Sequence, residues 1–282
     1  QRHPLGLYTE QLSTTAFTAP GHLNRRTWCY RIQPSVSQSG FKPWNNHRIE
    51  SAPISEICPH QPLRWSPYPG PTEVLDFVDS LHTIVANGDV KTQTGLAVHL
   101  YHCSKAMGAR YFYTADGELL FVPVAGQMLI NTELGKLLIE PGEIAVIPRG
   151  IKFKADPITS SCNGYICENY GAPLTLPERG PVGANGFANQ RDFQYPVAAF
   201  EAGSNQVELI AKYSGELYFA TMDHSPLNVV AWTGNSAPYK YNLSRFNAMN
   251  SVSFDHPDPS IFTVLTSPSA LPGIANLDFV IF

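Results

Sequence analysis

The sequence is poor in charged residues and has no long apolar run. Charged side chains make up 15% of the 282 residues, and 19 basic against 23 acidic residues give a formal net charge of −4. No basic tract that would hold a phosphate backbone is present, so we expect no nucleic-acid partner. No apolar run approaches the roughly 18 residues that a membrane-spanning helix needs. We therefore expect no membrane partner either.

Cysteines are also few, and their spacing excludes several kinds of site. The five cysteines, an odd number, form no C-x-x-C motif. This pattern favours reduced thiols over a disulfide framework. A secretory signal is absent, as are the G-x-S-x-G, H-E-x-x-H and Walker motifs. We therefore expect a cytoplasmic protein that uses none of these catalytic devices.

Turn-forming residues are abundant instead. The 24 prolines and 21 glycines are spread along the chain, which favours short strands over long helices. A short helix is predicted over 72–83. Apolar runs separated by turn residues predict the strands of an antiparallel sandwich or barrel. These runs are 95–101, 118–122, 127–130, 136–139, 143–147, 207–210, 216–219, 228–232, 261–265 and 277–282.

The two ends of the chain differ from its middle. Residues 1–75 are Pro-rich and irregular, and we expect them to form an arm with short strands that precedes a β-barrel over 76–282. The chain starts at Gln1 without a methionine, which suggests that the first residues of the gene product are missing. The last predicted strand ends on an apolar edge, and such an edge invites aggregation. We therefore expect the natural chain to continue.

One segment carries a specific architectural motif. Gly142, Pro148 and Gly150 follow the spacing G-x5-P-x-G-x2, which forms a strand–turn–strand corner in a small jelly roll. This motif resembles the second motif of the cupin superfamily. Metal-binding cupins end it with a His ligand, whereas this chain has Phe153. The segment 110–116 also lacks the His and Glu ligands of the first cupin motif. Because a phenyl ring has no lone pair for a metal, we expect a degenerate cupin barrel.

The predicted class is therefore mainly all-β: a cupin-like jelly roll or β-sandwich with a long irregular N-terminal arm and few short helices. Histidines offer little prospect of rebuilding a metal site. His99 and His102 form H-x-x-H, but on a strand they point to opposite faces. His82 and His256 are interpreted as hydrogen-bonded structural residues, and the glycine-rich segment 180–186 as a tight loop.

Paired arginines near aromatic residues are the clearest binding feature. Arg25 and Arg26 lie close in sequence to Trp28 and Tyr30. A guanidinium can hold a carboxylate with two hydrogen bonds. Salt bridges within or between subunits are the competing interpretation of these arginines.

A wider likeness to a known family spans nearly the whole chain. It is carried by the segments 6–13, 17–20, 24–28, 30–36, 225–232, 238–243 and 254–266. They resemble the family of homogentisate 1,2-dioxygenases. The resemblance implies cleavage of the aromatic ring of homogentisate by O2, giving maleylacetoacetate in tyrosine and phenylalanine catabolism. It also implies an Fe(II) cofactor held by two His and one carboxylate, a His as acid and base, and assembly into trimers or hexamers.

The same resemblance implies that the iron ligands lie in a C-terminal domain that this chain lacks. We therefore expect no catalytic residue and no metal ligand here, but an N-terminal structural and assembly domain. An arm from Tyr8 to Arg31 is expected to reach a neighbouring subunit's site. Candidates for the substrate pocket or for subunit contacts are Tyr8, Glu10, Arg25, Arg26 and Tyr30. The alternative is a non-catalytic cupin-like domain for assembly or small-molecule binding.

Overall fold

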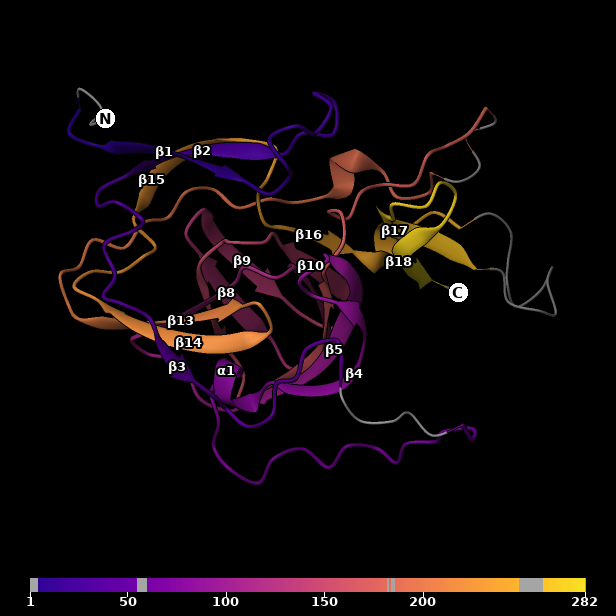
Figure 1. The fold of residues 1–282 in the computed structure, drawn as a ribbon, viewed down its shortest axis with the longest axis horizontal. Helices are drawn as coiled ribbons and strands as arrows, with labels where there is room; N and C mark the ends of the chain where they lie inside the picture. Colours follow the sequence, from indigo (N-terminus) through magenta and orange to yellow (C-terminus); the bar gives the residue numbers. More distant parts are fainter. Residues whose placement is uncertain (1–4, 55–59, 182, 184–185, 249–260, 282) are drawn as a thin grey trace.

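The fold is built from two facing β-sheets, seen in a computed structural model that describes residues 5–54, 60–181, 183, 186–248 and 261–281 (Figure 1). The first sheet has the strand order β16 (Tyr239–Asn242), β10 (Glu143–Ile147), β7 (Glu118–Ala125), β12 (Cys162–Asn169), β5 (Thr94–Cys103) and β4 (His82–Asp89). The second has the order β3 (Lys42–Trp44), β14 (Glu216–Met222), β13 (Val207–Tyr213), β6 (Arg110–Thr114), β11 (Phe153–Pro157), β8 (Met128–Thr132) and β9 (Gly135–Ile139).

Two smaller sheets lie outside this pair (Figure 1). The strands β1 (Tyr8–Ser13), β2 (Arg26–Arg31) and β15 (Val229–Gly234) form a three-stranded sheet, so the N-terminal arm pairs with a strand from far along the chain. The strands β17 (Phe262–Pro268) and β18 (Ala275–Ile281) form a hairpin of their own. Single 3-10 turns occur at Gln190–Asp192 and Leu243–Arg245.

All ten predicted strands are present, as β5, β7, β8, β9, β10, β13, β14, β15, β17 and β18. Together with the facing sheets they confirm the mainly all-β, jelly-roll class. One exception to antiparallel pairing is β13, which runs parallel to β6. No helix in the described part of the chain is long and apolar enough to cross a membrane.

The helix predicted over 72–83 was wrong in extent. Helix α1 covers only Phe77–Ser80, a single turn whose N-cap, Asp76, accepts a hydrogen bond from the backbone N–H of Asp79. Leu81 is already extended, and β4 starts at His82. The predicted range 72–83 is therefore divided among an irregular stretch, a single buried helical turn and the start of the edge strand β4.

The predicted jelly-roll motif includes the turn before β10, with Gly142, and the turn from β10 to β11, with Gly150. Gly142 and Gly150 have φ angles of +88° and +83°, in the left-handed region where only glycine is unstrained. The Gly150 N–H donates to the carbonyl of Thr114, which ties the corner to the neighbouring strand β6. The corner delivers Phe153 into the barrel, where its side chain is fully buried.

Aromatic rings from both sheets fill the centre of the barrel. The Phe153 ring meets Phe112 edge-on at 5.6 Å and Phe121 at 6.1 Å between ring centroids. Helix α1 adds Phe77, which stacks on Phe121 at 5.7 Å. Such ring pairs contribute stability beyond their buried area. The barrel is therefore held together by close packing of its own side chains.

Candidate functional site

The barrel interior is where the resemblance to cupins would put a metal. Phe153 occupies the position of the cupin His ligand and lies among other rings. In the ranges that the structure describes, no three His, Cys, Asp or Glu side chains are grouped so that they could hold a metal ion. The described residues therefore do not fit an iron centre, and we derive no reaction step through one.

A buried ionic network lies beside the ring cluster. The ammonium group of Lys212 on β13 lies 3.0 Å from Glu168 Oε2 on β12 and 2.9 Å from Asp116 Oδ2. Glu168 also accepts a hydrogen bond from the hydroxyl of Thr114 and lies 3.2 Å from His99 Nε2. This network joins the two facing sheets through charged groups that have almost no contact with solvent.

The electrostatics of the network favour the charged form of Glu168. Burial alone would raise the pKa of this carboxyl, but the charge of Lys212 and the contacts with His99 and Thr114 outweigh burial and lower the pKa to about 2. The space between His99, Glu168 and Lys212 is about 10 Å³, enough for one water at most. The network therefore has the character of a structural crosslink and not of a substrate site.

The two histidines of the H-x-x-H motif do not act together. His99 is buried and its Nδ1 lies 2.8 Å from the hydroxyl of Thr83, whereas His102 is half-buried on the other face of β5. The prediction that they point to opposite faces is confirmed. His82 stacks on Tyr68. His256 lies outside the described residues, as do the segment 254–260 and part of the glycine-rich loop 180–186.

Glu10, one of the predicted site residues, belongs to a second ionic group. Arg31 lies between two carboxylates, with Nε 2.9 Å from Glu10 Oε2 and Nη2 2.5 Å from Glu133 Oε2. The Glu133 side chain is 1% exposed and Glu10 is 26% exposed. Glu10 also accepts from the backbone N–H of Ser35. Arg31 therefore connects the N-terminal arm to Glu133 in the β8–β9 turn, and Glu10 holds Arg31 and Ser35 together within the arm.

The five predicted site residues do not come together at one place. The register of β1 and β2 puts Tyr8 and Glu10 on the face that carries Arg31, and Tyr30 and Arg26 on the opposite face. Arg26 is exposed, and its backbone pairs with Asn235. A role for Tyr8, Glu10, Arg26 or Tyr30 in a substrate pocket or a subunit contact stays a prediction.

Arg25 differs from the other candidates because it lines a cavity of about 670 Å³. The cavity has walls from the β1–β2 loop, the stretch after β12, the stretch around the first 3-10 turn, and strands β15 to β17. Its lining is aromatic and polar: His22, Arg25, Leu174, Thr175, Leu176, Gln190, Phe193, Tyr195, Trp232, Gly234, Asn235, Ala237, Tyr239 and Leu265. A volume of this size is typical of small-molecule sites.

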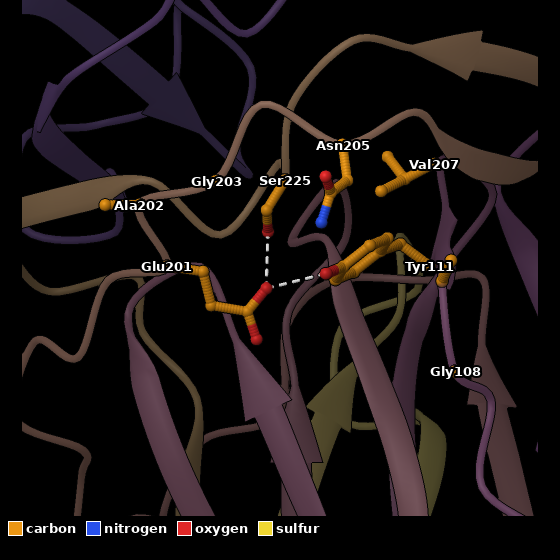
Figure 2. Close-up of a pocket in the computed structure, with 9 residues that line it drawn as sticks. Gly108, Tyr111, Glu201, Ala202, Gly203, Asn205, Val207 and Ser225 are labelled. Carbon is orange, nitrogen blue, oxygen red and sulfur yellow. Dashed lines mark hydrogen bonds between the residues drawn. The ribbon is translucent and has the colours of Figure 1, made fainter.

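A second, smaller cavity of about 300 Å³ surrounds Glu201 (Figure 2). The Oε2 atom of Glu201 accepts hydrogen bonds of 2.6 Å from the hydroxyls of Tyr111 and Ser225, and its Oε1 atom lies 3.0 Å from the ammonium group of Lys154. Burial alone would raise the pKa of the Glu201 carboxyl, but these three contacts outweigh it and lower the pKa. Because both oxygens are engaged, Glu201 fixes its loop against β6 and β11 instead of offering a free base.

Sequence reasoning missed the buried network entirely. A signal was present, because inward positions alternate along a strand: His99 stands between the buried residues Ala97 and Tyr101 on β5. A polar residue at an inward position of an apolar strand needs a partner. The partners of His99 are Thr83 and Glu168 on the two strands beside β5, and Lys212, which pairs with Glu168, lies on a strand of the opposite sheet. These pairings could not be chosen from the sequence.

Comparison with known protein families covers the whole chain. Residues 1–243 match the family model described as homogentisate 1,2-dioxygenase N-terminal, and residues 244–282 match homogentisate 1,2-dioxygenase C-terminal. The expectation that the C-terminal domain is absent was therefore wrong, because the C-terminal model begins within the chain and covers β17 and β18. The lack of a set of iron ligands in the sequence did not show where the C-terminal domain begins.

Curated relatives give the same result. Homogentisate 1,2-dioxygenases from two strains of Rhodopseudomonas palustris are each 53% identical to this chain over 284 residues. The alignment covers 100% of this chain and 63% of each relative, so the chain spans less than two thirds of their length.

Solved structures overlap with only part of the chain. A cupin-2 domain protein from Shewanella frigidimarina shares 21% identity over 32% of this chain and 79% of its own, with a TM-score of 0.27. A protein with a double-stranded β-helix domain from Klebsiella pneumoniae shares 13% identity over 39% of this chain and 90% of its own, also with a TM-score of 0.27. With two family models matched in order and 53% identity along its full length, the chain belongs to the homogentisate 1,2-dioxygenase family.

Proposed function

We propose that this chain is part of an enzyme that cleaves the aromatic ring of homogentisate with O2. The reaction adds both oxygen atoms to the substrate and gives maleylacetoacetate, so it needs no further reductant. The observation that carries the proposal is the 53% identity to curated homogentisate 1,2-dioxygenases over the full length of this chain. Catabolism of tyrosine and phenylalanine is the corresponding physiological setting.

The proposed cofactor is Fe(II) and the proposed reaction type is extradiol cleavage. Iron bound by two His and one carboxylate has open positions for a substrate oxygen and for O2. The residues described here do not supply that ligand set. Their proposed contribution is a barrel stabilised by the packing of its own aromatic rings, together with surfaces for assembly and for substrate.

Assembly into homo-oligomers is part of the proposal. The stretch 60–74 runs outside the barrel without regular structure (Figure 1). Several large apolar side chains on it are exposed, among them Leu63, Trp65, Tyr68 and Val74. Exposed apolar side chains concentrated on one stretch support a contact surface.

A further part of the proposal is the cellular location. Because four cysteines in the described ranges are free and buried, we propose that the protein works in the reducing cytoplasm.

Iron content and O2 uptake with homogentisate test this function. We expect no turnover by the 282-residue chain alone and iron-dependent O2 uptake by a chain extended to the length of the curated relatives. Turnover by the short chain would contradict the placement of the iron ligands outside the described residues. Absence of turnover by both chains would contradict the proposed activity and favour the alternative, a non-catalytic cupin-like assembly domain.

A further inference from the structure

The Arg25 cavity has a positive charge that makes no direct contact with a carboxylate of the described residues. In the described part of the chain the Arg25 guanidinium has no ion pair and no hydrogen-bond acceptor, and no Asp or Glu lines the cavity. Glu118 is nearby: burial raises the pKa of its carboxyl, and the charge of Arg25 acts in the opposite direction. The Oε1 of Glu118, however, accepts from the backbone N–H of Leu174 and, at 3.1 Å, from the amide of Asn169. A half-buried guanidinium that lines a cavity and contacts no carboxylate directly favours the binding of an anion.

The guanidinium is carried on a well-held loop. The backbone N–H of Arg25 donates to the Thr15 hydroxyl at 2.9 Å, and its carbonyl accepts from the N–H of Thr14 at 3.1 Å. The side-chain amide of Asn235, which also lines the cavity, donates to the carbonyl of Asn24 at 3.1 Å. The site is therefore largely pre-formed, so that little ordering is needed when a ligand binds.

Two pairs of aromatic rings form the walls. Tyr195 meets Trp232 at 6.3 Å, and Phe193 meets Tyr239 at 5.6 Å, both nearly edge-on. Burial raises the pKa of the Tyr239 phenol, Glu118 raises it further, and Arg25 lowers it. Tyr239 is therefore a neutral donor close to Arg25. Its hydroxyl has no hydrogen-bond partner among the described residues and can bind a ligand oxygen.

From this combination we infer that the cavity binds a small aromatic carboxylate, with the carboxylate on Arg25 and the ring between the aromatic walls. Arginine matches a carboxylate with two parallel hydrogen bonds. The inference rests on the proposed function, because homogentisate is a hydroxylated phenylacetate and has both features. It goes further by assigning the recognition of the acid group to one named side chain.

Binding of 3-hydroxyphenylacetate to the 282-residue chain tests the inference, since this acid is stable in air. Trp232 lines the cavity, so quenching of its fluorescence can report binding alongside calorimetry. We expect the acid to bind and both acetate and the neutral alcohol 3-(2-hydroxyethyl)phenol to bind at least about tenfold more weakly, because each lacks one recognised feature.

The matched variants are Arg25→Gln and Arg26→Gln. We expect Arg25→Gln to weaken binding of the acid about tenfold to a hundredfold and to leave binding of the alcohol unchanged. Arg26→Gln removes the neighbouring charge on the exposed face and should bind the acid like the parent chain. Circular dichroism and urea unfolding show whether both variants keep the parent fold, and Arg25→Lys, which retains the charge, should recover part of the affinity.

Three results would overturn the inference: no binding of the acid at millimolar concentration, equal loss in both Gln variants, or loss of Arg25-dependent binding in a chain extended to the length of the relatives. The last result would mean that further polypeptide fills the cavity. Failure of the proposed function is a separate outcome. It would appear as absent O2 uptake in the extended chain while Arg25-dependent binding persists.

Discussion

Lys212 and Glu168 form an ion pair across the two facing sheets, with 3.0 Å between Nζ and Oε2, and both side chains are at most 2% exposed. Each of these groups would be costly to bury alone. The pair is completed by Asp116 and Thr114, which take up the remaining hydrogen-bonding capacity. It follows that the barrel should depend on the ionisation state of this pair.

Acid should destabilise the protein through Glu168. Its pKa is lowered to about 2 in the folded state, against an ordinary value near 4.3 in the unfolded chain. The stabilisation is complete above about pH 4.3 and is lost as the pH falls towards 2, and amounts to about 3 kcal/mol. Urea unfolding of the parent chain and of Glu168→Gln between pH 7 and pH 3 measures how the free energy of unfolding changes with pH.

We expect a smaller acid dependence in Glu168→Gln, whose stability at neutral pH is already lower. The control is Glu73→Gln, which removes the exposed ion pair between Arg48 and Glu73 and should cost at most about 1 kcal/mol. An acid dependence in Glu168→Gln as steep as in the parent chain would show that other carboxylates dominate the response.

Removing Glu133 should cost much more than removing Glu10. Both carboxylates pair with Arg31, but Glu133 is almost completely buried, whereas Glu10 is partly exposed. We expect Glu133→Gln to lower the free energy of unfolding by about 3 kcal/mol and Glu10→Gln by at most about 1 kcal/mol. Chemical denaturation of the two variants measures the difference. Equal losses would contradict the dominance of the buried partner.

Restoring the His of the cupin motif should not restore a metal site. In Phe153→His a polar imidazole replaces a ring packed among Phe77, Phe112 and Phe121. We expect a loss of about 3 kcal/mol in stability and no stoichiometric binding of Co2+ in optical titrations. Phe153→Leu, which keeps the site apolar, should lose less. A tetrahedral cobalt spectrum from Phe153→His would contradict this prediction.

Two glycines with positive φ should respond differently to substitution by alanine. At Gly142 (φ +88°) an added Cβ has open space around it, so only backbone strain of about 1 kcal/mol is expected. At Gly126 (φ +75°) the same atom would lie 2.3 Å from the carbonyl oxygen of Ser161. We expect Gly126→Ala to lose at least twice as much stability, as measured by thermal and urea unfolding. Equal losses would show that the backbone at Gly126 moves aside easily.

Much of the barrel was predictable because its strands are local apolar runs bounded by turn residues. The corner with Gly142 and Gly150 was predictable as well, since the required backbone conformation restricts those positions to glycine. Strand β12 was missed because it carries the polar residues Asn163, Glu168 and Asn169, and the burial of Glu168 depends on groups from other strands.

The cavity was less accessible to sequence reasoning than the barrel. The arginine pair suggested carboxylate binding, but the choice between Arg25 and Arg26 depends on where the β1–β2 loop lies. Trp232 and Tyr239 reach the same cavity from more than 200 residues further along the chain. Only long-range pairing, such as that of β2 with β15, brings these side chains together.

The parallel pairing of β6 with β13 has a consequence for how the chain is made. Strands β5 to β12 pair with one another within residues 94–169, but two of them also have late partners: Arg110 on β6 pairs with Glu208, 98 residues later, and Glu143 on β10 pairs with Asn242. At about 5 to 20 residues per second on a ribosome, β13 is synthesised roughly 5 to 20 seconds after β6. Until then one edge of β6 has no partner strand. During that interval the nascent barrel presents unsatisfied backbone groups, and this is the stage at which a molecular chaperone would matter most.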